Sequence, residues 1–207
     1  GDVTDIEAIQ RLGDEGVLAM VCDSTNVFVD GSAGSEADVR VAMNKLIAGL
    51  KGKVAVACFA SNVARMDTVI RAAQAAGRKV VLAGRSMHRM AGAARSVGLL
   101  KDIQPLLDDH LAKNVPEDQI LYLCTGSQGE PRAALARIAE GNHPHIRMSQ
   151  GDHVIFSSRV IPGNEIPIRN LQNKLADRGV RLYTERDHPG IHVSGHPCRD
   201  ELAQMYA

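Results

Sequence analysis

Residues 53–84 read KVAVACFASNVARMDTVIRAAQAAGRKVVLAG, and this stretch decides the fold. Two runs within it, 54–59 and 79–83, are apolar almost throughout, and apolar residues recur at helical spacing from 63 to 73 between them. Strands that do not alternate with polar residues are buried on both faces, which is typical of parallel sheets. The stretch therefore predicts a β-α-β unit with a right-handed crossover.

The same rhythm continues along the chain. Further strands are expected at four apolar runs, 17–22, 120–124, 153–157 and 180–184. Helices are expected between the strands, and one of them begins at Ser35, an N-cap signal followed by Glu36 and Asp38 in the first turn. Strands that alternate with helices predict an α/β fold, a three-layer αβα domain with a mostly parallel, Rossmann-like central sheet.

Composition restricts the class of protein. The chain has 207 residues, of which 44% are apolar and 23% charged, as in an ordinary globular protein. Lys plus Arg equals Asp plus Glu, 24 each, so no net field attracts a polyanion or an anionic lipid surface. No apolar run approaches the roughly 18 residues of a membrane helix, and we expect no membrane partner.

The four cysteines favour a reducing compartment. No two are separated by two residues, and three of them, Cys22, Cys58 and Cys124, lie in or at the end of apolar runs that read as buried strands. Cysteine in such a position behaves as a small apolar side chain. We therefore expect neither a disulfide framework nor a thiolate metal site.

A local basic stretch lies between residues 61 and 100, where seven basic residues accompany the single acid Asp67. The basic residues are Arg65, Arg71, Arg78, Lys79, Arg85, Arg89 and Arg95. Such a stretch is either a solvated helix surface or a source of contacts to phosphate groups.

Small polar residues follow the predicted strands, at the edge where ligands of open parallel sheets bind. They occupy 23–26, 60–62, 84–86, 125–130 and 157–159. Hydroxyls, amides, glycines and arginines suit phosphate and sugar oxygens, although the same residue types also cap ordinary turns. The loop 125–130 resembles a glycine loop that opens a helix and can cradle a phosphate, but it lacks the lysine of a P-loop.

Eight histidines raise the question of a metal. His143 and His145 are expected in an exposed loop, and two histidines alone do not make a zinc site. His192 and His196 differ, because Ser194 and Gly195 between them allow close approach of an anion. The residues by themselves predict a phosphate-binding cleft without a complete catalytic set.

Six segments stand in an order that resembles the ribonuclease J family, in the β-CASP branch of the metallo-β-lactamase superfamily. They are DSTN at 23–26, FASN at 59–62, GRSM at 84–87, TGSQGEP at 125–131, IPGNE at 161–165 and HVSGH at 192–196. The resemblance implies a β-CASP domain at 28–186, a flank from the metallo-β-lactamase domain at 1–27, and a segment at 187–207 that returns to that domain.

The resemblance also implies a function. Members of this family hydrolyse RNA phosphodiesters in RNA processing and decay in the cytoplasm, 5′-to-3′ from a 5′-monophosphate end and internally, with two zinc ions. The implied partners are single-stranded RNA with a 5′-monophosphate and the metallo-β-lactamase domain of the same parent chain. The parent protein is expected to be a homo-oligomer.

Site residues follow from the matched motifs. Asp23 matches the acidic motif A, and His196 matches the motif B histidine that contacts the scissile phosphate or assists the leaving group, with Asp23 orienting it. The substrate-binding run consists of His192, Val193, Ser194, Gly195 and His196. The residues expected to line the pocket for RNA or its 5′-phosphate are Ser127, Gln128 and Gly129.

The family's zinc ligands have no match in this chain. We therefore expect no cofactor here, two zinc ions in the full-length parent, and no RNA cleavage by the isolated chain. Two other functions compete with this hypothesis. One is a small-molecule α/β enzyme that binds a nucleotide through the loop 125–130, and the other is a non-catalytic interaction domain.

Overall fold

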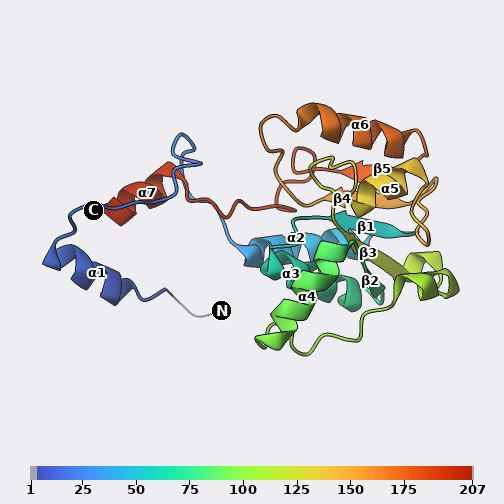
Figure 1. Cartoon of the computed structure of the whole chain (residues 1–207), viewed down its shortest axis with the longest axis horizontal. Helices are drawn as coiled ribbons and strands as arrows, with labels where there is room; N and C mark the ends of the chain where they lie inside the picture. The colour runs from blue at the N-terminus through green and yellow to red at the C-terminus, as the bar shows by residue number, and fades with distance from the viewer. Residues whose placement is uncertain (1–3, 207) are drawn as a thin grey trace. The chain divides into compact units, whose positions relative to one another are not determined.

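The computed structural model of the chain describes residues 4–206 (Figure 1). These residues form two compact units. The larger unit is Gly34–Ser194, and the smaller one combines the N-terminal stretch up to Ala33 with the C-terminal stretch from Gly195. The predicted limits 1–27, 28–186 and 187–207 concern which segments belong to a larger fold, and they stay a prediction.

The larger unit contains one parallel sheet of five strands in the order β2-β3-β1-β4-β5. The strands are β1 Val54–Ala57, β2 Lys79–Ala83, β3 Ile120–Cys124, β4 His153–Phe156 and β5 Arg181–Tyr183. Each was predicted from its apolar run, and β1, β4 and β5 are shorter than expected. The all-parallel sheet confirms the predicted α/β fold class.

Helices cover both faces of the sheet, which makes the three layers (Figure 1). One face is covered by α2 Glu36–Ala48, α3 Val63–Ala75 and α4 Arg85–Ser96. The other face is covered by α5 Ala134–Glu140 and α6 Glu165–Ala176. The stretch 101–118, which was expected to be irregular, contains the short 3₁₀ helix η1 Asp109–Asn114 and the start of a second one, η2 Glu117–Gln119.

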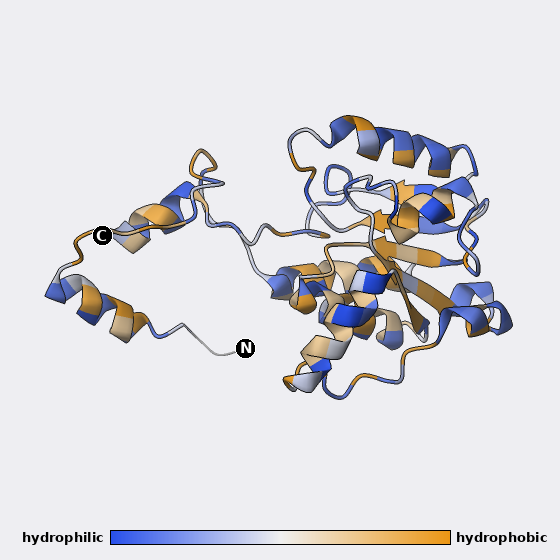
Figure 2. Ribbon diagram, in the orientation of Figure 1, coloured by the Kyte–Doolittle hydropathy of each residue, from blue (hydrophilic) through white to orange (hydrophobic). Residues whose placement is uncertain are grey.

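The central strand β1 shows why the sequence pattern predicts this arrangement. All four of its residues are buried, with Val54 and Val56 packed against one helical layer and Ala55 and Ala57 against the other. In Figure 2 the strands are orange while the outer helices carry most of the blue residues. A strand with apolar side chains on both faces is stable only between two layers.

The predicted N-cap of α2 is confirmed. The side chain of Ser35 accepts a hydrogen bond from the backbone N–H of Asp38, and the Asp38 carboxylate accepts one from the backbone N–H of Ser35. This reciprocal capping box satisfies two donors at the start of the helix. The helix ends at Ala48, before the predicted stop at Gly52.

The smaller unit contains two helices, α1 Ile6–Glu15 and α7 Arg199–Tyr206. An isolated parallel β-bridge joins Asn26 to Cys198. The backbone N–H groups of Gly31 and Ala33 donate to the carboxylates of Asp200 and Glu201 at the start of α7. The helix predicted within 197–207 is therefore confirmed over its described residues, whereas α1 has no counterpart among the predicted helices.

The predicted strand at 17–22 is wrong. These residues have no strand structure, and the side chains of Leu18 and Val21 are fully exposed. A strand needs a hydrogen-bonded neighbour, and the described part of this unit offers the segment none. Cys22 is exposed with it, contrary to the expectation of burial. Cys58, Cys124 and Cys198 are buried, and all four cysteines are free thiols.

No helix within residues 4–206 is long and apolar enough to cross a membrane.

Candidate functional site

The carboxyl edge of the sheet collects the turns that follow the strands, because all five strands run in the same direction. The turns after β1, β3 and β4 meet there through backbone hydrogen bonds. The backbone N–H of Ser157 donates to Ala57 O at 2.9 Å, and that of Cys58 donates to Cys124 O at 3.2 Å. Polar side chains that are distant in sequence are thereby brought to one edge.

Arg65 lies buried at this edge, on α3. Its Nε and Nη2 donate to the two carboxylate oxygens of Glu36 at 2.8 and 3.1 Å. Its Nη1 donates to the backbone oxygen of Ser157 at 3.0 Å and to the Ser157 hydroxyl at 2.7 Å. A buried guanidinium is stable only when paired and hydrogen-bonded in this way, so Arg65 is committed to internal contacts rather than to a phosphate.

His192 completes this network. Its Nδ1 lies 3.1 Å from Nη1 of Arg65. A guanidinium has only donors, so a hydrogen bond between these two atoms makes Nδ1 the acceptor and leaves the ring proton on Nε2. Burial, and then the positive charges of Arg65 and Arg159, lower the pKa of His192 from 6.5 to about 4. The imidazole is therefore neutral at pH 7, with its tautomer set by Arg65.

The predicted pocket residue Gln128 is buried, and its side-chain amide is fully used by the chain following β4. Its Nε2 donates to the Ser158 hydroxyl at 3.2 Å and to Arg159 O at 2.9 Å. Its Oε1 accepts from the backbone N–H of Ile161 at 3.0 Å and from Asn164 Nδ2 at 3.3 Å. Gln128 therefore fastens the loop 125–130 to the segment 157–164.

Ser127 and Gly129 are the neighbours of Gln128 in this loop. Gly129 has φ +75°, and a Cβ placed there would lie 2.5 Å from the backbone carbon of Pro167. Only glycine fits so close to the first turn of α6. Ser127 is 2% exposed and lines a cavity at the ends of β4 and β5. Of the three predicted loop residues, Ser127 lines this cavity, whereas Gln128 and Gly129 pack behind it against the segments 158–164 and 167–168.

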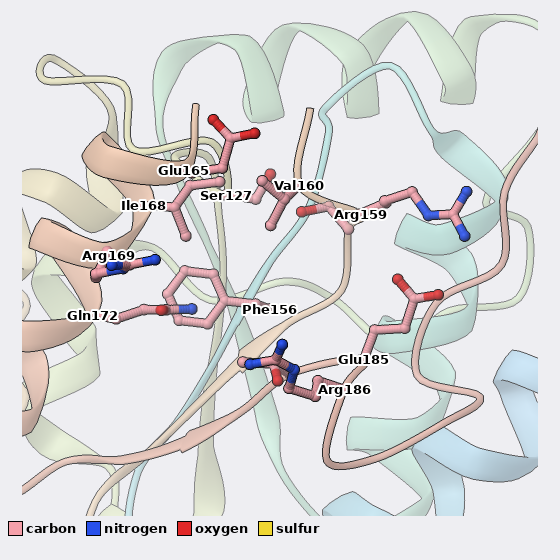
Figure 3. Close-up of a pocket in the computed structure, with 12 residues that line it drawn as sticks. Ser127, Phe156, Arg159, Val160, Glu165, Ile168, Arg169, Gln172, Glu185 and Arg186 are labelled. Atoms are coloured by element: carbon pink, nitrogen blue, oxygen red, sulfur yellow. The ribbon is translucent and has the colours of Figure 1, made fainter. Parts of the chain in front are cut away.

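This cavity has a volume of about 730 Å³ and lies between α6 and the segments that follow β4 and β5 (Figure 3). Its charged residues are Arg159, Arg169, Arg186, Glu165 and Glu185. Figure 3 shows them around the ring of Phe156. Three guanidinium groups and the Ser127 and Ser158 hydroxyls form a donor-rich wall that suits phosphate oxygens.

Arg169 and Arg186 were missed by the sequence analysis. Arg169 lies on the polar side of a helix, where charge is ordinary, and Arg186 follows a strand whose turn carried no other signal. A comparison of the turns after the last two strands would have indicated Arg186, because it lies three residues after β5, as Arg159 lies three residues after β4. The position of Arg169 depends on how α6 packs.

Asp23 and His196 meet in the smaller unit, although they are 173 residues apart. Nδ1 of His196 donates to one Asp23 carboxylate oxygen, and the backbone N–H of Thr25 donates to the other at 2.8 Å. Asn26 Nδ2 donates to His196 O at 3.1 Å. The hydrogen bond from His196, and then those from Thr25, lower the pKa of Asp23 to about 2. The carboxylate is therefore ionised and orients the imidazole ring.

The predicted run 192–196 is divided between the two units. His192, Val193 and Ser194 belong to the larger unit, where Val193 packs against the core that underlies α2 and α3. Gly195 and His196 belong to the smaller unit and are exposed.

The histidine pair at 143 and 145 differs from its prediction. His143 is buried, and its Nδ1 accepts hydrogen bonds from the backbone N–H groups of His145 and Ile146 at 3.4 and 3.2 Å. Burial is the main cause that lowers the pKa of His143. His145 is exposed, as expected. Within residues 4–206 no three His, Cys, Asp or Glu side chains are placed to hold a metal ion.

The basic stretch 61–100 separates into two groups. Arg65, Arg71 and Arg78 make internal contacts: Arg71 Nε donates to both oxygens of Asp67, and the buried Arg78 donates to three backbone carbonyls. Arg65 and Arg78 are therefore neither solvated surface nor phosphate contacts, whereas Arg71 is partly exposed and paired with Asp67. Arg85, Arg89 and Arg95 are exposed on α4, and Lys79 is exposed at the start of β2.

Comparison with known proteins gives a consistent result. A family model described as "Ribonuclease J, beta-CASP domain" matches residues 51–175. A ribonuclease J of Sinorhizobium meliloti is 46% identical over 206 residues, covering 100% of this chain and 36% of the relative. Those of Mycolicibacterium smegmatis and Mycobacterium tuberculosis are 44% and 42% identical over 207 residues, each covering 100% of this chain and 37% of the relative. The chain thus spans a little over a third of the length of these relatives.

Proposed function

The chain belongs to the ribonuclease J family, and we propose that it is the RNA-binding β-CASP part of a zinc-dependent ribonuclease. The observation that carries this proposal is the arginine-lined cavity at the carboxyl edge of a sheet that the family match covers almost completely. The parent enzyme hydrolyses phosphodiester bonds of RNA in the cytoplasm, 5′-to-3′ and internally. It works as a homo-oligomer in RNA processing and decay.

The RNA is held by its phosphates. Arg159, Arg169 and Arg186 present forked donors to phosphate oxygens, and the hydroxyls of Ser127 and Ser158 add hydrogen bonds. Gln128 and Gly129 act through the shape of the loop, because the Gln128 amide is occupied by protein groups. A 5′-monophosphate carries more negative charge than a 5′-hydroxyl, so such a wall prefers the phosphorylated end.

The segment 192–196 contributes to substrate binding in the same proposal. The neutral His192 offers an Nε2–H donor, since Arg65 occupies the other ring nitrogen. Val193, Ser194 and Gly195 supply backbone groups and a small profile that admits a phosphate. These roles come from the family motif, and the geometry of Arg65 supports the one assigned to His192.

His196 and Asp23 are proposed to act on the reacting phosphate. Asp23 accepts the hydrogen bond from Nδ1 of His196, so that Nε2 is the atom available for chemistry. When the imidazole is protonated, Nε2–H donates to a phosphate oxygen or transfers its proton to the leaving oxygen. Asp23 stays ionised throughout and holds the ring orientation, as a carboxylate does in other His-Asp pairs.

The two zinc ions expected for the family do not fit residues 4–206, where no group of three ligands converges. We propose that the metallo-β-lactamase domain of the parent holds them, and that the isolated chain cleaves no RNA. Zinc-dependent ribonuclease activity in a purified sample of this chain would contradict that proposal.

The decisive experiment is a titration of fluorescent single-stranded RNA, with 5′-monophosphate and 5′-hydroxyl ends compared at 50 and 200 mM salt. We expect salt-sensitive binding that prefers the 5′-phosphate, and Arg169→Gln with Arg186→Gln should weaken it. Arg181→Gln is the matched control, because Arg181 lies at the opposite end of β5 from Arg186. Equal binding by the double variant and the control would exclude this cavity as the RNA site.

A further inference from the structure

A second basic cavity lies at the β2–β3 side of the carboxyl edge. Arg85 and Arg89 are four residues apart on α4, so they share one face of the helix. Arg132 and Arg137 come from the segment between β3 and the end of α5. All four line a cavity of about 880 Å³. The two pairs are more than 40 residues apart in the sequence, so the sequence alone did not predict that they line one cavity.

The charge in this groove is poorly compensated. Its acidic residues are Asp109 and Glu130, against four arginines. Within residues 4–206, no ion pair or side-chain hydrogen bond joins Arg85, Arg89 or Arg132 to another group. By contrast, Arg65, Arg71 and Arg78 in the same basic stretch are all committed to protein acceptors. The fourth arginine, Arg137, donates to the backbone oxygen of Asn142 at 3.5 Å. Guanidinium groups that converge without carboxylate partners are suited to an anionic ligand.

The chemistry of the groove favours phosphates over bases. No Phe, Tyr or Trp is among its lining residues, so stacking on a base has no platform of that kind. The first turn of α4 opens into the same groove, and its N-cap Gly84 provides no side-chain capping bond. The arginines and these backbone N–H groups all donate, which matches phosphate oxygens in any sequence.

The groove and the first cavity flank the same loop. Thr125 and Glu130 line the groove, whereas Ser127, between them, lines the first cavity. Gln128 fastens this loop to the segment after β4. The groove adjoins β2 and β3 and the first cavity adjoins β4 and β5, so their midpoints are separated by three strand spacings of about 4.8 Å each, or about 14 Å. This distance is longer than one nucleotide, so a single nucleotide cannot occupy both phosphate-binding regions.

We infer that the groove of Arg85, Arg89, Arg132 and Arg137 binds the phosphates of a second stretch of the same single-stranded RNA, which crosses the loop 125–130 from the first cavity. This inference rests on the proposed RNA binding at the first cavity. The groove contacts the backbone without reading sequence, so it lengthens the site and makes affinity depend on RNA length.

The test compares 5′-monophosphorylated RNAs of 2 and 12 nucleotides across a salt series, using the whole chain. Each phosphate contact to a single strand contributes a slope of about 0.7 in log affinity against log salt. Arg85→Gln with Arg89→Gln should lower the slope for the 12-mer by about 1.4 and leave the dinucleotide unchanged. Arg95→Gln, on the same helix but outside the groove, is the matched control and should change neither slope.

The outcomes separate the two proposals. If the Arg85/Arg89 variant keeps the wild-type slope for the 12-mer while Arg169→Gln weakens binding, the groove is not part of the RNA site and the first cavity remains. If the wild-type chain binds neither RNA at 50 mM salt, the proposed function fails and this inference fails with it. Retention of far-ultraviolet circular dichroism by each variant establishes that folding is intact.

Discussion

Nη1 of Arg65 lies 3.1 Å from Nδ1 of His192, and the two residues are 127 positions apart. This contact ties α3, where Arg65 is buried, to the segment that begins the motif 192–196. It also joins stability to the proposed function, because the same guanidinium neutralises Glu36 and sets the tautomer of a residue expected to bind substrate.

The first prediction concerns the stability that Arg65 provides. Arg65→Met leaves Glu36 and Ser157 without their donor, so the free energy of unfolding should fall by about 3 kcal/mol. Arg65→Lys should recover only part of it, because an ammonium group cannot form the same fork. Urea denaturation measures both. Arg40→Met is the control: its pair with Asp67 is solvent-exposed and should contribute under about 1 kcal/mol. Equal losses in the two Met variants would contradict the buried network.

The second prediction is a pH dependence from His192. Its pKa is about 4 in the folded chain against 6.5 ordinarily, so between these values the unfolded chain binds more protons. Stability should therefore be fully present above pH 6.5 and fall as the pH drops toward 4. The loss should be about 2 kcal/mol, less than the full shift implies because solvent screens the ring in part.

Burial is also the main cause that lowers the pKa values of His143 and His153, so the quantity to measure is the difference between wild type and His192→Gln. The glutamine keeps an acceptor for Arg65 but has no titration. In addition, ¹⁵N NMR of the ring should show Nδ1 unprotonated at pH 7. A protonated Nδ1, or identical pH profiles for the two proteins, would refute the assignment.

The third prediction uses a pair of glycines near α6. Gly129→Ala should destabilise the chain by more than about 2 kcal/mol, because the new Cβ meets the Pro167 backbone at 2.5 Å in addition to the strain of φ +75°. Gly163→Ala has similar strain at φ +95° but no atom within 4 Å, so about 1–2 kcal/mol is expected. Thermal unfolding of both variants isolates the steric part, and an equal effect would argue against tight packing of the loop.

The fourth prediction concerns Asp23 and His196. The Asp23 carboxyl should titrate near pH 2 by ¹³C NMR, and His196→Ala should raise this midpoint part of the way to 3.8, since the bond from Thr25 remains. His145→Ala is a control that should leave it unchanged. In the full-length parent, His196→Ala should lower the cleavage rate about 100-fold or more with a smaller effect on RNA affinity. A variant that loses affinity and rate equally would mark His196 as a binding residue only.

Much of the fold was predictable because burial leaves a strong pattern. The strand 54–57 is apolar on both faces, and the capping box at Ser35 depends only on Asp38, three residues later in the sequence. The run 17–22 shows the limit of such reasoning, since an apolar pattern indicates burial without showing which segment provides the neighbour. It is exposed in the described residues, and no local signal distinguishes it from the true strands.

The site was predictable only where local sequence carried it. The turns after the strands followed from the parallel order, whereas Asp23 and His196 were paired through a family motif. Arg65 reads from sequence as surface charge, and its burial depends on Glu36 and His192, which lie far away in the chain. Long-range pairing of this kind is set by the topology and not by spacing.

The four hydrogen bonds of the Gln128 amide have a kinetic consequence for any ligand of the adjoining cavity. They immobilise two loops during folding, so the conformational entropy of those loops is already lost before an RNA arrives. A preordered wall of this kind needs no slow closure to admit its ligand, and variants of it should change residence time more than capture rate. Gln128→Ala removes these four hydrogen bonds, so the two loops would lose their conformational entropy when RNA binds and not when the chain folds.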